Sequence, residues 1–190
     1  MRSLLLFAAA AAFAQQPPAR ILVAYHSDTG NTEKLAQAVR KGAASVAGVE
    51  VTLRKTAEVK DEDIPGYDGI LVGTPVHWAN VSTETRRFLD RIGAALWKAK
   101  TNGDGRTAGA FCTGGGVAMG KDTARISILI ALLTMRFIVI GGVDDAGFGT
   151  LGPEATTGQG EPGVNEKKQE EARRFGERFA RMTRQVRSAR

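Results

Sequence analysis

Hydroxyl side chains and one glycine directly follow the first strongly apolar run of this chain. The run is Ile21–Tyr25 and the polar stretch is Ser27–Thr32, which reads Ser-Asp-Thr-Gly-Asn-Thr. The apolar run predicts a strand, and a helical pattern begins after the polar stretch. The first N–H groups of a helix have no intrahelical partner and lie at the positive end of its dipole, so they can bind a phosphate. Helix capping without any ligand explains the same residue types equally well.

Alternating apolar segments predict the elements that would position this loop. Strands are expected at residues 21–25, 49–53, 69–73, 107–112 and 137–141. Helices are expected from about residue 32, around 88–96, at 122–133 and at 172–186, where apolar residues recur at spacings of three and four. Residues 142–165 are rich in Gly, Pro and Thr and are expected to form a long loop. The nearly continuous apolar strands predict a parallel sheet with helices on both faces.

Two further specialised loops leave the carboxyl ends of predicted strands, where ligands bind in sheets of this kind. They are Thr74–Asn80 and Thr113–Gly120. The glycines at 115 and 120, followed by Lys121, have the spacing of a nucleotide-binding Walker A motif. However, Asp122 stands where that motif needs a hydroxyl group for Mg²⁺, and an aspartate there would repel phosphate. Nucleotide hydrolysis is therefore the weaker interpretation of this segment.

Together the three loops resemble those of the flavodoxin superfamily, and of its WrbA-like NAD(P)H:quinone oxidoreductases in particular. Ser27–Thr32 matches the [Ser/Thr]-x-Thr-Gly-x-Thr phosphate loop, Gly73–Asn80 is similar to the Gly-Thr-Pro-x-x-aromatic-Gly-Asn loop, and Thr113–Gly116 is similar to the Thr-Gly-x-Gly-Gly loop. The likeness covers roughly residues 20–183, although Ala79 replaces a usual glycine. It implies an α/β, flavodoxin-like three-layer fold with a five-stranded parallel sheet in the order 2-1-3-4-5 and helices on both faces.

The resemblance also implies that FMN is the cofactor, with its phosphate on the first loop and its ring between the other two. The residues expected to bind it are Ser27, Thr29, Gly30, Asn31, Thr32, Pro75, Val76, His77, Trp78, Ala79, Asn80, Thr113, Gly114, Gly115 and Gly116. Trp78 is expected to stack on the flavin or shield one edge of it. His77 is the candidate catalytic residue, as a proton donor to a reduced quinone, and an ordinary surface histidine is the alternative. His26 is expected to be structural or to interact electrostatically with the phosphate.

Two functions remain open on this resemblance. The first is an NAD(P)H:quinone oxidoreductase, which takes reducing equivalents from a nicotinamide through FMN to a quinone. The second is a flavodoxin-like electron carrier that serves a redox partner protein and turns over no small molecule. The basic charge and the long loop at 142–165 favour the enzyme. A homo-oligomer, either a dimer or a tetramer, is a further implication of the resemblance.

Positive charge is concentrated at the end of the chain. The formal net charge is +6, and residues 166–190 hold nine Lys or Arg against four Glu. A solvated helix face explains this excess more simply than nucleic-acid binding, so no nucleic-acid partner is expected. Residues 186–190 are expected to form a basic C-terminal tail.

The first residues have the pattern of a secretory signal peptide. Arg2 precedes a short apolar run that ends in Ala12-Phe13-Ala14, an A-x-A cleavage site. The expected organisation is a signal peptide at 1–14, a linker at 15–19 and an FMN-binding domain at 20–185, with no integral membrane segment after cleavage. The protein would then be exported, periplasmic or extracellular, or cytoplasmic if the signal is not used. Cys112 is the only cysteine, which excludes an intrachain disulfide, and it is expected to be a buried structural thiol.

Overall fold

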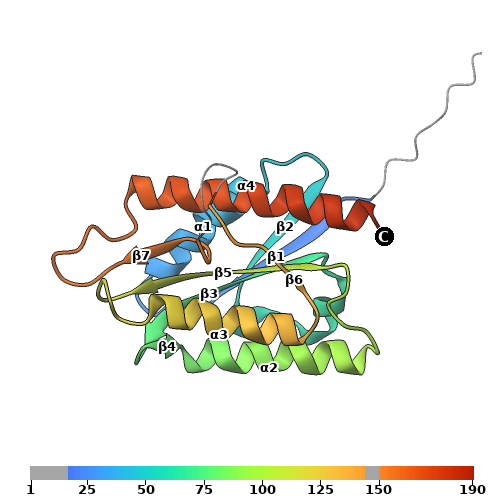
Figure 1. The fold of residues 1–190 in the computed structure, drawn as a ribbon, viewed down its shortest axis with the longest axis horizontal. Coiled ribbons are helices and arrows are strands. Elements are labelled where there is room, and N and C mark those ends of the chain that lie inside the picture. Colours follow the sequence, from blue (N-terminus) through green and yellow to red (C-terminus); the bar gives the residue numbers. More distant parts are fainter. Residues whose placement is uncertain (1–16, 144–149) are drawn as a thin grey trace, which may run out of the picture.

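The elements of the fold follow the predicted alternation of strands and helices (Figure 1). A computed structural model describes residues 17–143 and 150–190. The strands are β1 (Ala19–Tyr25), β2 (Val49–Lys55), β3 (Gly69–His77), β4 (Asn80–Val81), β5 (Thr107–Gly114), β6 (Ile138–Val139) and β7 (Glu154–Thr156). The helices are α1 (Asn31–Ala43), α2 (Thr83–Lys98), α3 (Lys121–Thr134) and α4 (Glu166–Ser188), with short 3₁₀ helices at Thr56–Glu58 and Asp61–Gly66. The signal peptide expected at 1–14 lies outside the described residues, and export stays a prediction.

The order of the main sheet is β2-β1-β3-β5-β6, with every neighbouring pair parallel. This confirms the predicted order 2-1-3-4-5, since β5 and β6 are the fourth and fifth main strands. Tyr25 pairs with Gly73 and Pro75 pairs with Thr113, so the carboxyl ends of β1, β3 and β5 lie at one edge. The three specialised loops all leave from that edge.

The far edge of the sheet differs from the prediction. The fifth strand, expected at 137–141, is reduced to Ile138–Val139, which pairs only with the start of β5. The chain then returns as β7, inside the segment expected to be a loop, and β7 pairs with the last residues of β5. Between the two strands, Gly142 has a positive φ of 79° and donates its N–H to the carbonyl of Thr150 at 2.7 Å. Two short strands therefore pair with the two ends of β5 at the edge where one strand was expected.

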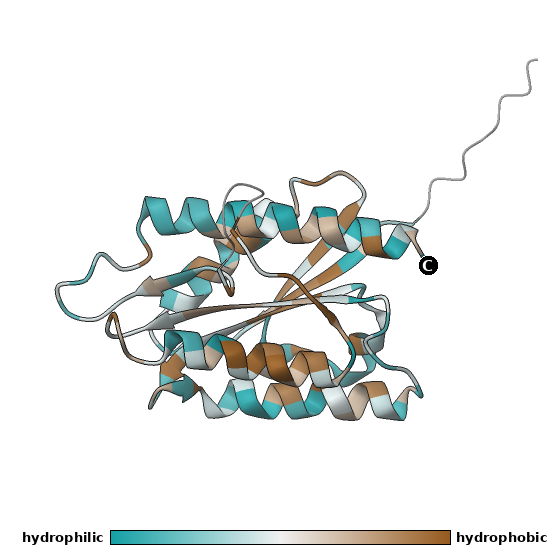
Figure 2. Cartoon of the chain, in the orientation of Figure 1, coloured by the Kyte–Doolittle hydropathy of each residue, from teal (hydrophilic) through white to brown (hydrophobic). Residues whose placement is uncertain are grey.

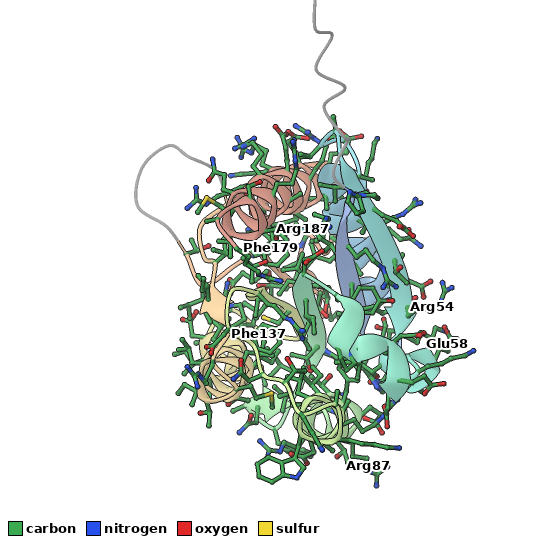
Figure 3. The ribbon with its side chains drawn as sticks, turned by 90° about the vertical axis from the view of Figure 1, so that its right-hand side faces the viewer. Arg54, Glu58, Arg87, Phe137, Phe179 and Arg187 are labelled. Carbon is green, nitrogen blue, oxygen red and sulfur yellow. The ribbon has the colours of Figure 1, made fainter. Side chains whose placement is uncertain are left out.

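Helices cover the two faces of the sheet in pairs. On one face α1 and α4 enclose a core that includes Leu35, Phe175 and Phe179, and on the other α2 and α3 enclose one that includes Phe88 and Ile128. Figure 3 shows α4 on one side of the sheet and α2 and α3 on the other. The predicted three-layer architecture is confirmed. Within the described chain, no helix combines the length and apolar character needed to cross a membrane.

The basic end of the chain belongs mainly to α4. The helix continues to Ser188, so most of the tail expected at 186–190 is its last turn. Several of its cations pair with glutamates of the same helix, as Arg173 does with Glu170 and Glu177. Ion pairs of this kind are typical of a solvated helix face. The absence of a nucleic-acid partner stays a prediction.

Candidate functional site

The first loop presents hydrogen-bond donors that have no acceptor in the protein. Gly30, with a positive φ of 84°, is the N-cap of α1, and no side chain caps this helix. The hydroxyl of Ser27 is buried and has no hydrogen-bond partner. Thr29 accepts a hydrogen bond from the Asn31 amide at 3.0 Å. A buried hydroxyl without a partner costs free energy, so together with an uncapped helix N-terminus it fits a site that an anion completes.

The second loop is a tight hairpin at the end of β3. Trp78 and Ala79 both have a positive φ, 49° and 63°, and the chain then returns as β4. The Trp78 side chain is fully exposed, and its predicted stacking on the flavin stays a prediction. The hydroxyl of Thr74 accepts a hydrogen bond from the Ser82 N–H and donates one to the carbonyl of Pro75, which fixes the base of the loop.

Replacing Ala79 with glycine is expected to stabilise the protein by about 0.5–1 kcal/mol. A Cβ atom disfavours the left-handed conformation that this position adopts, and glycine removes that cost. Thermal denaturation should show a melting temperature higher by about 1–4 °C. Ala94→Gly on the exposed face of α2 is the control and should lose about 0.5–1 kcal/mol. A lower melting temperature for Ala79→Gly would contradict the prediction.

The third loop is held from within by Lys121, the first residue of α3. This side chain is only 4% exposed. Its ammonium donates to the carbonyls of Gly116 and Val117 and to the hydroxyl of Thr156, at 2.9, 3.0 and 2.9 Å. All three donors of the lysine are therefore used, and Glu154 on β7 lies 3.8 Å away. Lys121 thus binds the loop to β7, which places β7 in the support of the site.

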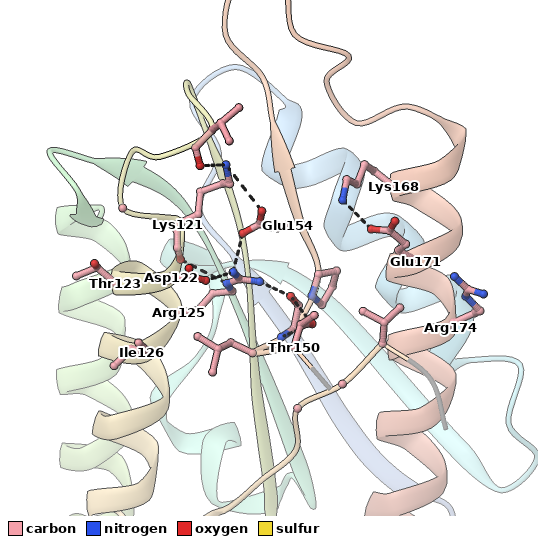
Figure 4. Close-up of a pocket in the computed structure, with 18 of the residues that line it drawn as sticks. Lys121, Asp122, Thr123, Arg125, Ile126, Thr150, Glu154, Lys168, Glu171 and Arg174 are labelled. Carbon is pink, nitrogen blue, oxygen red and sulfur yellow. Dashed lines mark hydrogen bonds and ion pairs between the residues drawn. The ribbon is translucent and has the colours of Figure 1, made fainter. Parts of the chain in front are cut away.

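Arg125, one turn further along α3, completes this charged network (Figure 4). Its guanidinium is buried and donates to Asp122 at 2.5 Å, to Glu154 at 2.6 Å and to the carbonyl of Gly152. These partners also occupy the two charged residues that follow the glycines of the Walker A spacing. Lys121 and Asp122 are both engaged by groups of the chain itself, and Lys121 points into its own loop.

Direct contacts join the three loops. The Thr32 and Thr113 hydroxyls lie 2.7 Å apart, which links the first loop to the third. Asp28 links the first loop to the second, since its carboxylate lies 2.8 Å from Nε2 of His26 and 2.9 Å from Nε2 of His77. The structure therefore brings the residues expected at 27–32, 75–80 and 113–116 to one edge of the sheet.

Two histidines, His26 and His77, lie beside the carboxylate of Asp28 in the first loop. His26 is largely buried and His77 is partly exposed, and their rings meet edge-on with centroids 6.2 Å apart. Glu84 lies 3.4 Å from the other nitrogen of His26. Through these contacts Asp28 positions both imidazoles beside the first loop. The catalytic role of His77 stays a prediction.

Other chemistry has little support in the described residues. Cys112 is buried, and burial raises the pKa of its thiol to about 12, so the thiolate is scarce at neutral pH. No group of His, Cys, Asp or Glu in residues 17–143 and 150–190 is arranged to hold a metal ion. A cleft between α3 and α4 is lined by Lys121 and Arg125 among others, but by none of the fifteen residues expected to bind FMN.

These features define a class of protein. An open parallel sheet carries an uncapped helix N-terminus, hydroxyl groups and a glycine-rich loop together at its carboxyl edge. The donors of the first loop are neutral, which suits a phosphate held by hydrogen bonds alone. The site is that of a flavodoxin-like, mononucleotide-binding α/β protein.

Comparison with known proteins agrees with this class. The family model described as Flavodoxin matches residues 23–117. A flavodoxin of Aquifex aeolicus is 38% identical over 161 residues, covering 85% of each chain. An NAD(P)H dehydrogenase (quinone) of Acidithiobacillus ferrooxidans is 32% identical over 146 residues, covering 64% of this chain and 70% of the relative. The crystal structure of a WrbA-like flavodoxin from Agrobacterium tumefaciens has a TM-score of 0.70 at 21% identity, covering 88% of this chain and 98% of that one.

The chain belongs to the flavodoxin family, which confirms the resemblance found in its loops. Membership implies FMN as the cofactor, and the unpartnered Ser27 hydroxyl and uncapped α1 fit its phosphate.

Proposed function

We propose that this protein binds FMN at the three loops and works as an NAD(P)H:quinone oxidoreductase. The observation that carries the FMN site is the buried Ser27 hydroxyl without a partner, beside the uncapped N-terminus of α1. The relative named NAD(P)H dehydrogenase (quinone) supports the reaction class. NAD(P)H would be the reductant and a quinone the acceptor.

The residues of the chain would have three tasks in this reaction. The first loop would hold the phosphate through backbone N–H groups of α1 and the hydroxyls of Ser27 and Thr29. Lys121 would keep the third loop in the shape that lets its backbone approach the ring. When bound, FMN supplies the hydride and electron chemistry. His77, whose Nε2 lies 2.9 Å from the Asp28 carboxylate, would be the proton donor to the reduced acceptor.

An electron carrier is the second candidate function. Relatives named flavodoxin, from Aquifex aeolicus and from Clostridium saccharobutylicum, match most of this chain at 38% and 30% identity. A carrier would transfer electrons to a partner protein without turning over a quinone. Steady-state oxidation of NADH and NADPH with benzoquinone separates the two functions. Turnover near zero, with flavin reduction in two resolved one-electron steps, would favour the carrier.

FMN titration, followed by the quenching of flavin fluorescence, tests the site itself. Stoichiometric binding is expected, and Ser27→Ala should weaken it about 10- to 100-fold, the value of one hydrogen bond to a charged group. Because the Ser27 hydroxyl has no protein partner, the melting temperature of the FMN-free protein should hardly change. Gly30→Val should abolish binding, since valine strongly disfavours a φ of 84°.

Ser188→Ala at the far end of α4 is the matched control and should bind FMN normally. Absence of binding at micromolar FMN, with the protein folded, would overturn the proposal. Equal affinities for Ser27→Ala and the unmodified protein would place the phosphate elsewhere.

A further inference from the structure

The outward face of α3 is apolar. Ile126, Ile130 and Leu133 lie on it and are 42%, 58% and 53% exposed. No charged residue occurs from Ile126 to Met135. Figure 2 shows hydrophobic colour along most of α3, whereas α2 and α4 carry many hydrophilic positions. A helix that is apolar all round is normally covered by protein on every side.

The inward face of α3 is already used by the fold. Ile128 and Leu132 are fully buried in the core shared with the sheet and α2, and Ala124 is also fully buried. The exposed residues therefore form a second apolar face, which the core does not require. Their spacings of four and three residues make a stripe along one side of the helix, and Ile138 on β6 is also exposed. Stripes of this kind are the contact surfaces of packed helix pairs.

We propose that the stripe Ile126–Ile130–Leu133 packs antiparallel against the same stripe of a second copy of this chain. With the two-fold axis close to Ile130, Ile126 of one copy would face Leu133 of the other. The exposed charges at the two ends of the stripe, Asp122 and Arg136, have opposite signs and would therefore attract each other in this antiparallel arrangement. Asp122 would lie near Arg136 of the second copy, and the helix dipoles would be opposed.

Charge selects this occupant over others. Asp122 already pairs with Arg125 at 2.5 Å, and Arg136 pairs with Asp104 at 2.7 Å, so contact between the copies would extend existing pairs into a network. The stripe itself is uncharged, so it offers no electrostatic attraction to a strongly basic or strongly acidic partner. A surface with opposite charges at its two ends is complementary to itself, as a two-fold interface requires. The concentrated basic charge of the chain lies on α4, on the opposite face of the sheet.

Sedimentation velocity of the purified protein from about 5 to 200 µM tests the interface. A dimer, or a larger assembly containing this contact, is expected. Ile130→Glu would place two carboxylates at the centre and should raise the dissociation constant about thirtyfold or more, the effect of losing a central contact residue. Because the Ile130 side chain is exposed, the Ile130→Glu monomer should melt at the same temperature as the unmodified monomer. The matched control Gln37→Glu adds the same charge on exposed α1, on the other face, and should leave the assembly unchanged.

Disulfide cross-linking locates the two-fold axis. Ile130→Cys should form a covalent dimer under mild oxidation, whereas Gln37→Cys should not. Cys112 is fully buried and does not compete. A tetramer that becomes a dimer in Ile130→Glu would also support the proposal, because it loses one of two interfaces. A monomer at 200 µM, or an assembly unaffected by Ile130→Glu, would overturn it.

Discussion

Lys121→Met is expected to destabilise the protein by about 3–5 kcal/mol and to remove high-affinity FMN binding. Methionine keeps an unbranched side chain about one atom shorter than that of lysine but cannot donate hydrogen bonds. The carbonyls of Gly116 and Val117 and the hydroxyl of Thr156 would lose their shared donor inside the protein. Glu154 would also lose a nearby cation, and breaking a buried pair by removing one partner typically costs this amount. The melting temperature should fall by roughly 10 °C for a domain of this size.

The loss of FMN binding follows from the position of the three acceptors. Two of these acceptors, the carbonyls of Gly116 and Val117, belong to the third loop. Without the lysine the loop would no longer be held in one conformation. FMN affinity should be measured at a temperature where circular dichroism shows the variant to be folded. Lys98→Met, at the exposed end of α2, is the control and should change neither the melting temperature nor the FMN affinity. A folded Lys121→Met protein that binds FMN normally would show that the loop keeps its shape without the lysine.

The order of the sheet could be predicted because each main strand has a local signal. Apolar runs such as Ile21–Tyr25 and Gly69–Gly73 are buried on both faces, and the helices between them have a clear period. The three loops could be predicted because parallel strands place their carboxyl ends at one edge. Strand β7 could not, since three residues in a segment rich in Gly and Pro have almost no local pattern. It pairs with the last three residues of β5, because β6 pairs only with the first two on that side.

The polar support of the site could not be predicted for a different reason. Lys121 is buried by partners such as Thr156, which is far from it in sequence, and no spacing within the motif reveals that contact. Charged residues are seldom buried without such partners, and the sequence showed Lys121 only as part of a weak Walker A match, without its structural role. Asp28 was likewise not selected, although its place between two histidines joins two loops. Distant pairs of this kind are visible only once the fold is known.

Gly120→Ala is expected to destabilise the protein by about 2–5 kcal/mol. Gly120 is the N-cap of α3 with a positive φ of 80°, which costs an alanine about 1–2 kcal/mol. A Cβ atom there would also lie 2.4 Å from the Cα of Ala79 and 2.6 Å from its carbonyl oxygen. Both contacts are with backbone, so the second and third loops would have to separate, and such overpacking typically costs a further 1–3 kcal/mol. FMN affinity should fall as well, because the flavin ring is expected between these loops.

Gly115→Ala is the matched control, because it makes the same change in the same loop. A Cβ on Gly115 would meet no atom within 4 Å, and the residue does not require a positive φ. Its thermal unfolding without FMN should therefore resemble that of the unmodified protein, while Gly120→Ala unfolds at a much lower temperature. Equal melting temperatures for the two variants would contradict the close contact between Gly120 and Ala79. If Gly115→Ala weakens FMN binding without loss of stability, the open space in front of Gly115 is where the cofactor lies.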